Sequence, residues 1–278
     1  MKTIVDPARM QETALRWRAE GLRVGFVPTM GFLHAGHTSL MDLARPLCDR
    51  LVVSIFVNPL QFGPGEDLDR YPRDPEGDAA QCRAHGTDLL FMPTALYPAG
   101  HATRVAVRGL SDGLCGADRP THFEGVTTVV ARLFGLVQPH VAVFGEKDYQ
   151  QLAILRRMTR DLALPVEVIG GSLVRDTDGV ALSSRNKYLT DSERTRARTL
   201  SGSLRAIQAA VRSGERHVPT LLALGRTHLD ADEVDYLDIR TADDLAALEV
   251  VDRPARVFGA ARYRHTRLID NMALPDVS

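Results

Sequence analysis

Two histidines, His34 and His37, flank a glycine in a turn that could bind phosphate. Residues 24–27 before them are apolar and predict a strand, and residues 38–47 predict an amphipathic helix. A helix N-terminus presents free backbone N–H groups and a positive dipole end, so phosphate binds readily there. A neutral imidazole can donate a hydrogen bond to phosphate, and a protonated one adds charge. The turn therefore predicts the triphosphate end of a nucleotide site. The alternatives are that each histidine is an ordinary surface or core residue, or that the two share a zinc ion, although no carboxylate or cysteine close by in sequence completes a ligand set.

A second turn of the same kind surrounds Lys147. Residues 140–144 predict a buried strand, and Gly145 begins a polar cluster at the start of the next helix. A lysine there can meet phosphate as a point charge, and Asp148 can accept a hydrogen bond from a ribose hydroxyl. Alternatively, Glu146 and Asp148 are ordinary acids of a first helical turn, where the helix dipole favours them.

Asn58 and Gln61 lie in a loop rich in proline and glycine. The preceding residues 51–57 form a continuous, β-branched apolar run, which predicts a buried parallel strand. The loop thus lies beyond the carboxyl end of a strand, where parallel sheets place their ligands. Its two amides donate and accept hydrogen bonds, which suits a small substrate with hydroxyl and carboxylate groups. A plain turn in which Asn58 caps its own backbone is the alternative.

A third polar cluster, Ser183-Ser184-Arg185, could clamp phosphate, because arginine offers a planar fork and serine hydroxyls donate. A polar linker between domains is the alternative. The acidic residues 66–78 could lie near a magnesium ion, or could simply form a solvated loop. Three further residues could line an anion site: Arg108, Arg119 and His122.

These segments alternate in the order of an α/β fold. We expect a Rossmann-like parallel sheet with the HxGH motif over residues 1–175 and a smaller α+β domain over residues 176–278. A capping box at Thr190 and Glu193 opens the first helix of the second domain. The other expected elements are helices over 7–21, 78–85, 126–137 and 220–229, a helix from the Lys147 turn to about 162, and strands over 89–92, 104–107, 166–174, 234–239, 256–263 and 266–269.

The composition narrows the class of protein. The chain has 278 residues, 44% of them hydrophobic and 25% charged, which is typical of a globular protein. The formal net charge is −1, so no global basic field favours nucleic acid. Three scattered cysteines, Cys48, Cys82 and Cys115, fit a reducing compartment. Because we find neither a secretory signal nor an apolar run that could span a bilayer, we expect a cytoplasmic protein without membrane or nucleic-acid partners.

Four clusters, taken together and in this order, resemble the pantothenate synthetase family, the pantoate–β-alanine ligases. The clusters are PTMGFLHAGH, NPLQFGPGEDLDRYP, FGEKDYQQ and LSSRN. The HxGH motif alone occurs in a broad superfamily of nucleotidyltransferases, whereas the four clusters in sequence are specific. The match runs from residue 24 to residue 189 and resumes in a closing RLIDN segment. The resemblance implies a Rossmann-like ATP-binding domain, a smaller C-terminal lid, a homodimer and no tightly bound organic cofactor.

The reaction that the resemblance implies has two halves. The pantoate carboxylate attacks the α-phosphorus of ATP, bound with Mg²⁺, and gives pantoyl adenylate and pyrophosphate. The amine of β-alanine then attacks the acyl carbon and gives pantothenate and AMP. Attack at phosphorus builds charge on the pyrophosphate, so positioning and electrostatics should dominate catalysis.

The resemblance also implies roles for individual residues. His34, His37 and Lys147 would be catalytic, with His37 as the proton donor.

Two residues depart from the family pattern. Phe32 stands where a small residue is expected and could narrow the entrance to the site, and Leu182 stands where methionine is expected. The implied ATP-binding residues are Met30, Gly31, Phe32, Leu33, His34, Ala35, Gly36, His37, Gly145, Glu146, Lys147, Asp148, Val174, Leu182, Ser183, Ser184 and Arg185. The implied pantoate residues are Gln61, Gln151 and Asn58; Gln61 would also lie near β-alanine, and Asp78 would approach the metal through water.

Two other functions stay open. A different HxGH transferase would leave the nucleotide on its product, but the NPLQFG and FGEKDYQQ clusters argue against it. A catalytically silent nucleotide-binding module would bind ATP without releasing pyrophosphate, but every expected polar group is present.

Overall fold

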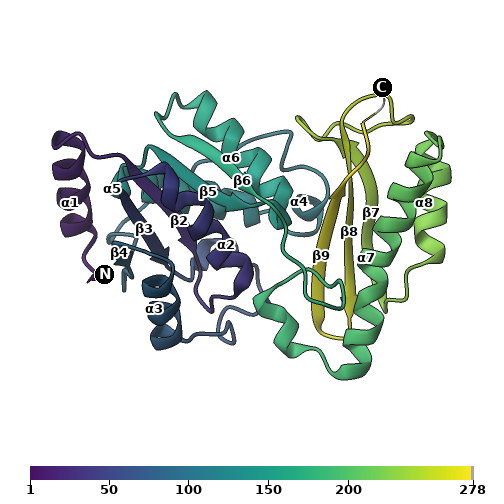
Figure 1. Ribbon diagram of the computed structural model, residues 1–278, viewed down its shortest axis with the longest axis horizontal. Helices are drawn as coiled ribbons and strands as arrows, with labels where there is room; N and C mark the ends of the chain where they lie inside the picture. The colour runs from purple at the N-terminus through teal and green to yellow at the C-terminus, as the bar shows by residue number, and fades with distance from the viewer. Residues whose placement is uncertain (277–278) are drawn as a thin grey trace.

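The larger part of the molecule is built on a parallel sheet (Figure 1). The computed structural model describes residues 1–276. Its six parallel strands lie in the order β1-β4-β3-β2-β5-β6, so the order reverses between β2 and β5. In open α/β sheets, ligands bind beyond the carboxyl ends of the strands at such a reversal. The strands are β1 (Lys2–Ile4), β2 (Val24–Thr29), β3 (Arg50–Ile55), β4 (Leu89–Phe91), β5 (Val141–Gly145) and β6 (Glu167–Gly171).

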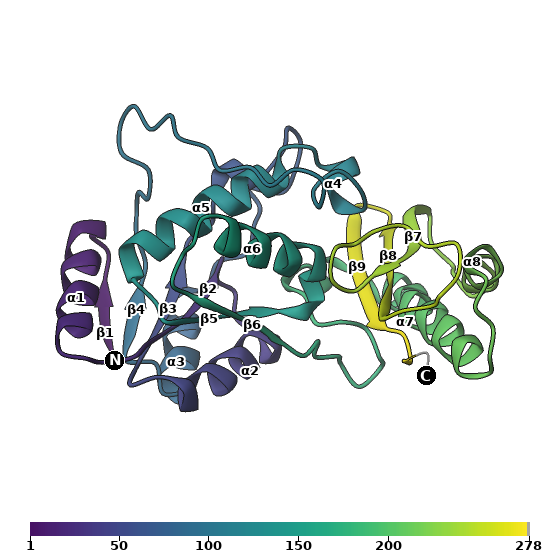
Figure 2. The same ribbon diagram turned by 90° about the horizontal axis from the view of Figure 1, so that it is seen from above.

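Helices cover both faces of this sheet, which explains why β2, β3 and β5 are apolar along their length (Figure 2). Phe26, Val52 and Phe144 face one side, and Val27, Val53 and Val143 face the other. On the first side lie α1 (Pro7–Ala19), α5 (His122–Val137) and α6 (Tyr149–Asp161), and on the second lie α2 (Ala35–Ala44) and α3 (Pro75–Ala84). A short helix, α4 (Cys115–Asp118), lies in the connection between β4 and α5.

The C-terminal part is a separate antiparallel sheet of three strands, in the order β7-β8-β9. Its strands are β7 (Glu233–Thr241), β8 (Ala255–Tyr263) and β9 (Thr266–Ala273), and its helices are α7 (Asp191–Arg212) and α8 (Val218–Thr227). Leu204, Ile207 and Val211 of α7 recur at helical spacing and pack on one face of this sheet. The other face turns toward the N-terminal unit, where Phe258 packs with Ile154 of α6.

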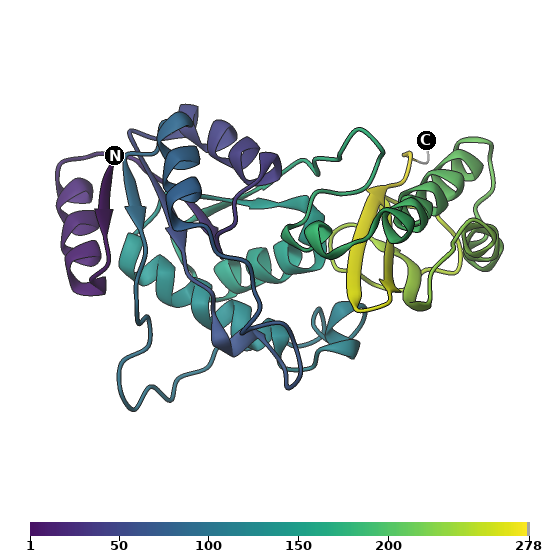
Figure 3. The ribbon, with the colours of Figure 1, turned by 90° about the horizontal axis from the view of Figure 1, so that it is seen from below.

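Four short 3₁₀ turns connect these elements: η1 (Arg45–Leu47), η2 (Pro59–Gln61), η3 (Glu146–Asp148) and η4 (Ser184–Tyr188). Three of them carry polar clusters that the sequence singles out. The segment that follows β6 crosses the junction between the two units and leads through η4 into α7 (Figure 3).

The expected α/β fold is confirmed, and the differences lie at element ends. The helix after the histidine motif begins at Ala35 rather than at residue 38, because His34 itself caps it. Helix α3 likewise begins at Pro75, capped by Asp74, rather than at residue 78. The strand expected over 104–107 is wrong: this segment joins no sheet, and the Val105 N–H donates to the Thr128 hydroxyl instead.

The connection between the two units runs from Gly171, where β6 ends, to Asp191, where α7 begins. The domain boundary at residues 175 and 176 stays a prediction.

The three cysteines, at positions 48, 82 and 115, are free thiols. Among the residues described, no helix has the length and apolar character needed to cross a membrane.

Candidate functional site

The histidine turn lies directly after β2, at the carboxyl edge of the sheet. His34 is the N-cap of α2, and its Nδ1 accepts the backbone N–H of Gly36 at 3.1 Å. The backbone N–H of His34 in turn donates to Nδ1 of His37 at 3.3 Å. Because both Nδ1 atoms accept hydrogen bonds, each neutral ring carries its proton on Nε2. Both side chains line the same cavity, so they present N–H donors to it.

The two imidazoles are neutral near pH 7. Burial, followed by the charge of Lys147, lowers the pKa of His34 to about 4, and burial together with His34 and Lys147 lowers that of His37 to about 3. Their ring centroids are 4.1 Å apart, so a charge on one ring would disfavour a charge on the other. The sequence allows either neutral imidazoles that donate hydrogen bonds to phosphate or protonated imidazoles that add positive charge. The structure favours the neutral form.

Asp78 of α3 fixes the turn that precedes these histidines. Its Oδ2 accepts the N–H of Phe32 at 2.9 Å, and its Oδ1 accepts that of Leu33 at 2.6 Å. Gly31 and Phe32 both have positive φ, +87° and +53°, so the chain turns sharply there. A Cβ on Gly31 would lie 2.9 Å from the Asp78 carboxylate, which explains the glycine. Asp78 is only 3% exposed and lies outside the cavity wall, and a role toward a metal stays a prediction.

A hydrogen-bond chain holds the loop after β3. Tyr97 Oη donates to Asn58 Oδ1 at 2.8 Å, and Asn58 Nδ2 donates to Gln61 Oε1 and to the Gly125 carbonyl, both at 3.0 Å. Asn58 also accepts the backbone N–H two residues on at 3.3 Å, as the capping alternative predicts. The chain leaves the Gln61 NH₂ group as a donor toward the cavity, 3.1 Å from the Met30 sulfur. Sequence reasoning missed Tyr97, because nothing in its local pattern points to Asn58.

These turns surround a cavity of about 240 Å³. One wall is apolar and comes from α5, and the polar groups come from the turns after β2, β3 and β5, from the N-terminal ends of α5 and α6, and from the segment that leads into η4. The apolar residues of α5 in this wall are Val126, Val129, Val130 and Leu133; the polar side chains include His34, His37, Asn58, Gln61, Arg119, His122, Lys147, Asp148, Gln151, Ser183, Ser184 and Arg185.

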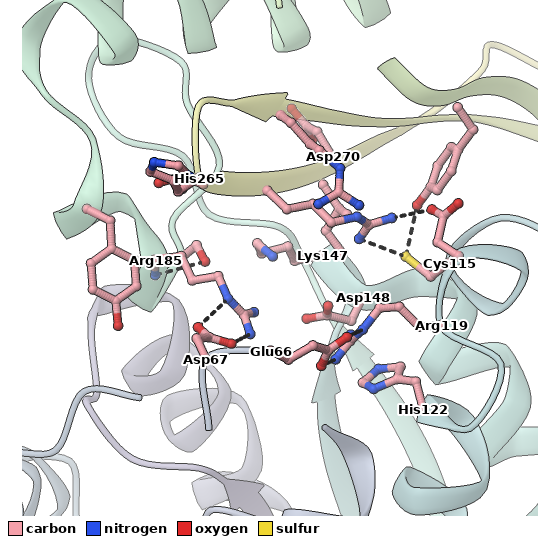
Figure 4. Close-up of a pocket in the computed structure, with 18 of the residues that line it drawn as sticks. Glu66, Asp67, Cys115, Arg119, His122, Lys147, Asp148, Arg185, His265 and Asp270 are labelled. Atoms are coloured by element: carbon pink, nitrogen blue, oxygen red, sulfur yellow. Dashed lines mark hydrogen bonds and ion pairs between the residues drawn. The ribbon is translucent and has the colours of Figure 1, made fainter. Parts of the chain in front are cut away.

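A second and larger cavity, of about 630 Å³, lies between the two units (Figure 4). It shares Lys147, Asp148 and Arg185 with the first cavity, so the two spaces meet at these residues. Its far wall includes Asp270 and His265 of the C-terminal unit. Cationic groups therefore lie where the two spaces meet.

The expected phosphate clamp, Ser183 to Arg185, lies against the histidine turn. Ser184 Oγ lies 3.4 Å from the Phe32 carbonyl oxygen, and the Lys187 ammonium lies 4.3 Å from the centre of the Phe32 ring. Phe32 therefore faces the η4 segment and does not line either cavity. The same segment is tied to the N-terminal unit by an ion pair between Arg185 and Asp67.

Strand β9 supports the Lys147 turn from the C-terminal unit. Asn271 Nδ2 donates to the carbonyl oxygens of Glu146 and Lys147, at 2.8 and 2.9 Å. The Glu146 carboxylate pairs with Arg256 of β8 at 3.0 Å, and its role toward ATP stays a prediction. The Lys147 side chain, in contrast, points to both cavities. Asn271 belongs to the RLIDN segment, but only the tertiary fold brings it to this turn.

The structure brings most of the expected site residues together around the two cavities. Arg119 and His122 line the walls of both, and Arg108 lines neither. Of the implied ATP residues, those in a wall are Met30, His34, Gly36, His37, Gly145, Lys147, Asp148, Val174, Leu182, Ser183, Ser184 and Arg185, and those behind it are Gly31, Phe32, Leu33, Ala35 and Glu146.

Comparison with known proteins decides the family. A profile of the family described as pantoate-beta-alanine ligase matches residues 2–273. The chain belongs to this family. A pantothenate synthetase of Solidesulfovibrio magneticus is 52% identical over 100% of this chain and 99% of its own length. The chain is accordingly a ligase that condenses pantoate with β-alanine.

Solved structures agree with the assignment. A pantothenate synthetase from Thermus thermophilus matches with a TM-score of 0.94 and 48% identity, over 99% of this chain and all of that one. A pantoate-beta-alanine ligase from Francisella tularensis, solved with β-γ ATP and β-alanine, matches with a TM-score of 0.82 and 29% identity over 98% of this chain and 97% of that one.

Proposed function

We propose that the condensation uses ATP and proceeds through pantoyl adenylate at the cavity between β2, β3 and β5. A carboxylate is a poor acyl donor, and adenylation gives it AMP as a good leaving group. The observation that carries the proposal is the convergence of Lys147, Arg185 and two neutral histidines around this cavity, with Lys147 and Arg185 also lining the larger one.

Pantoate would lie against α5 in the smaller cavity. Its dimethyl group fits the apolar wall that contains Val129 and Val130, and its hydroxyl and carboxylate groups fit the amides of Gln61 and Gln151. The hydrogen-bond chain through Asn58 fixes the orientation of Gln61, so its NH₂ group is aimed before substrate arrives. Gln61 would also contact β-alanine when the amine approaches the acyl carbon.

The triphosphate would lie across the histidine turn. The Nε2–H groups of His34 and His37 would donate to phosphate oxygens, and Lys147 would meet the charge that develops during attack at the α-phosphorus. Ser183, Ser184 and Arg185 would cover the outer phosphates. The His37 imidazole is neutral without phosphate, so it would act as a proton donor only if bound phosphate raises its pKa and the ring first takes up a proton from solvent, which it then passes to the leaving group.

Adenine would lie at the other end of the cavity, beside the backbone of Val174 and the side chain of Leu182. We propose that ATP enters with Mg²⁺, which usually binds through phosphates and one or two carboxylates. The exposed carboxylate of Asp148 lies in the walls of both cavities and fits this role. Asp78 fits it less well, because both of its oxygens accept backbone N–H groups.

In the first half-reaction a carboxylate oxygen of pantoate would bond to the α-phosphorus while the bond to pyrophosphate breaks. In the second, the β-alanine nitrogen would bond to the acyl carbon while the bond to AMP breaks and the amine loses a proton. Both β-alanine and pyrophosphate would pass through the larger cavity, which borders the reacting groups at Lys147.

Transfer of oxygen-18 tests this route. Pantoate labelled in its carboxylate should deliver one labelled oxygen to AMP when β-alanine is supplied, because the adenylate C–O bond breaks on the acyl side. Label found only in pantothenate and water, with none in AMP, would rule out the adenylate. Unlabelled pantoate run in labelled water provides the control.

We also propose a homodimer in the cytoplasm, as the family resemblance implies. Sedimentation of the purified chain tests the assembly, and a mass that stays at one chain over the working concentration range would contradict it. Fractionation of the producing cells tests the location.

A further inference from the structure

Arg185 has an anionic partner within the chain, the carboxylate of Asp67. Its Nε lies 2.9 Å from Asp67 Oδ2, and its Nη2 lies 2.8 Å from Asp67 Oδ1. Both residues line the larger cavity, and their paired side chains lie side by side in its wall (Figure 4). The two side chains are 30% and 18% exposed, so water screens the pair only in part.

The Asp67 carboxylate occupies the Nε and Nη2 edge of the Arg185 guanidinium, which is one of the edges that could bind a phosphate. A guanidinium binds carboxylate and phosphate through the same planar pair of N–H donors. One pair of guanidinium N–H donors can bind only one bidentate acceptor at a time. Although burial acts to raise the pKa of Asp67, the hydrogen bond and the charge of Arg185 hold that pKa below its ordinary value, so Asp67 is ionised near pH 7.

We propose that Asp67 is a positioning residue that holds Arg185 in the empty enzyme and gives it up to a phosphate of ATP. The inference rests on the role proposed above for Arg185. When ATP binds, Arg185 exchanges the Asp67 carboxylate for a phosphate group. The Arg185 guanidinium therefore stays over the site both before and after nucleotide binding. Asp67 thereby weakens ATP binding while it prevents Arg185 from leaving the site.

The neighbouring ion pair explains why the exchange would stay local. Glu66 accepts two hydrogen bonds from Arg119, at 2.7 and 2.6 Å, and Arg119 also donates to the Gln61 carbonyl at 3.1 Å. The Glu66–Arg119 pair therefore fixes residues 61–66, which precede Asp67 and carry the proposed pantoate residue Gln61. On the other side of Asp67, Tyr188 Oη donates a hydrogen bond to the Arg70 carbonyl at 2.9 Å. This bond lies near the surface, so it can break when the Asp67–Arg185 pair separates. Loss of Asp67 should therefore change ATP binding and leave pantoate use unaltered.

Calorimetry of ATP–Mg²⁺ binding to the full chain tests the proposal. Asp67→Asn keeps the shape of the side chain and removes its charge, so it should tighten ATP binding by about fivefold to thirtyfold, as expected for a half-buried bidentate pair. Asp69→Asn removes the same charge from an exposed residue two positions away and should change the affinity less than about twofold. Asp67→Ser provides a second variant, and thermal melting confirms that each is folded.

The Arg185→Gln background separates competition from a general charge effect. If Asp67 acts by occupying Arg185, Asp67→Asn should tighten ATP binding in the natural chain and have no effect in Arg185→Gln. Equal tightening in both backgrounds would overturn the proposal, as would unchanged or weakened binding in the Asp67 variants. Weakened binding would mean that the carboxylate orients Arg185 for phosphate.

The same titrations distinguish this inference from the proposed function. If the natural chain does not bind ATP, the proposed function fails and the inference fails with it. If the natural chain binds ATP and the Asp67 and Asp69 variants behave alike, only the inference fails. The KM for pantoate should stay within about twofold in Asp67→Asn, because the Glu66–Arg119 pair remains.

Discussion

The two sides of the site are held in different ways. The floor, which comprises residues 30–37, Asp78 and residues 58–61, is fixed by hydrogen bonds within the N-terminal unit. The cover, residues 183–188, is held by the Arg185 ion pair, by a part-buried contact of Ser184 with the Phe32 carbonyl and by an exposed hydrogen bond from Tyr188. Breaking a buried hydrogen bond leaves an unsatisfied group at a high cost in free energy, whereas a partly exposed ion pair exchanges partners at a low cost. The floor is therefore complete before ligands arrive, and the cover is the side that responds to them.

The largest expected effect on catalysis comes from replacing Lys147, and Lys187 in the cover provides the control. Lys147→Ala should slow pantoate-dependent pyrophosphate release by about a thousandfold or more, because it removes a cation from the developing charge. Lys187→Ala should have little effect, since Lys187 is exposed and contacts the Phe32 ring. Both variants should melt near the temperature of the natural chain. Near-natural adenylation by Lys147→Ala would refute the assignment.

A break in the floor should cost stability as well as activity. Asp78→Ala leaves two backbone N–H groups without acceptors in a buried turn, so the free energy of unfolding should fall by about 2–4 kcal/mol. Denaturant unfolding measures the loss, with the exposed Asp69→Ala as the matched control. If Asp78→Ala unfolds at the same denaturant concentration as the natural chain, the floor does not depend on this carboxylate.

A change in the pantoate loop should separate the substrates. Gln61→Ala should raise the KM for pantoate by about tenfold to a hundredfold, because a hydrogen bond to a charged group contributes about 1.5–3 kcal/mol. The KM for ATP should change far less. Gln138→Ala, at the opposite end of α5, provides the control. Unchanged pantoate dependence would count against Gln61.

The smallest effect concerns pH. The pKa of His37 lies at about 3 in the folded chain, below the ordinary 6.5, so the unfolded chain binds a proton that the folded chain does not. The free energy of unfolding should be highest above pH 6.5 and fall as the pH drops toward 3. Melting at pH 7 and at pH 5 checks this: His37→Asn should lose less stability between the two than the natural chain, and the exposed His228→Asn should lose as much as the natural chain does. Identical losses in all three would contradict a neutral His37.

The sequence predicted the fold because its signals are local. The apolar run of residues 51–55 and the capping box at Thr190 each specify an element without help from distant residues. The start of α2 was missed, since histidine is an unusual cap and only the completed turn shows His34 in that role. The 104–107 segment resembled a strand, but the threonines of α5 supply its hydrogen bonds.

The site was predictable residue by residue but not in its pairings. Spacing and resemblance indicated Lys147, Gln61 and Arg185. The partners that hold them are distant in sequence: Asn271 lies 124 residues from the Lys147 carbonyl that it holds, and Asp67 lies 118 residues from Arg185. Such pairs depend on how the two units meet, which no local pattern encodes.

Pyrophosphate release in a rapid-quench experiment tests the central claim most directly. The natural chain is mixed with ATP, Mg²⁺ and pantoate, first without β-alanine and then with it. A preformed floor that makes pantoyl adenylate predicts a burst of one pyrophosphate per site without the amine and continuous turnover with it. Absence of the burst, with pyrophosphate released only after β-alanine is added, would contradict the account.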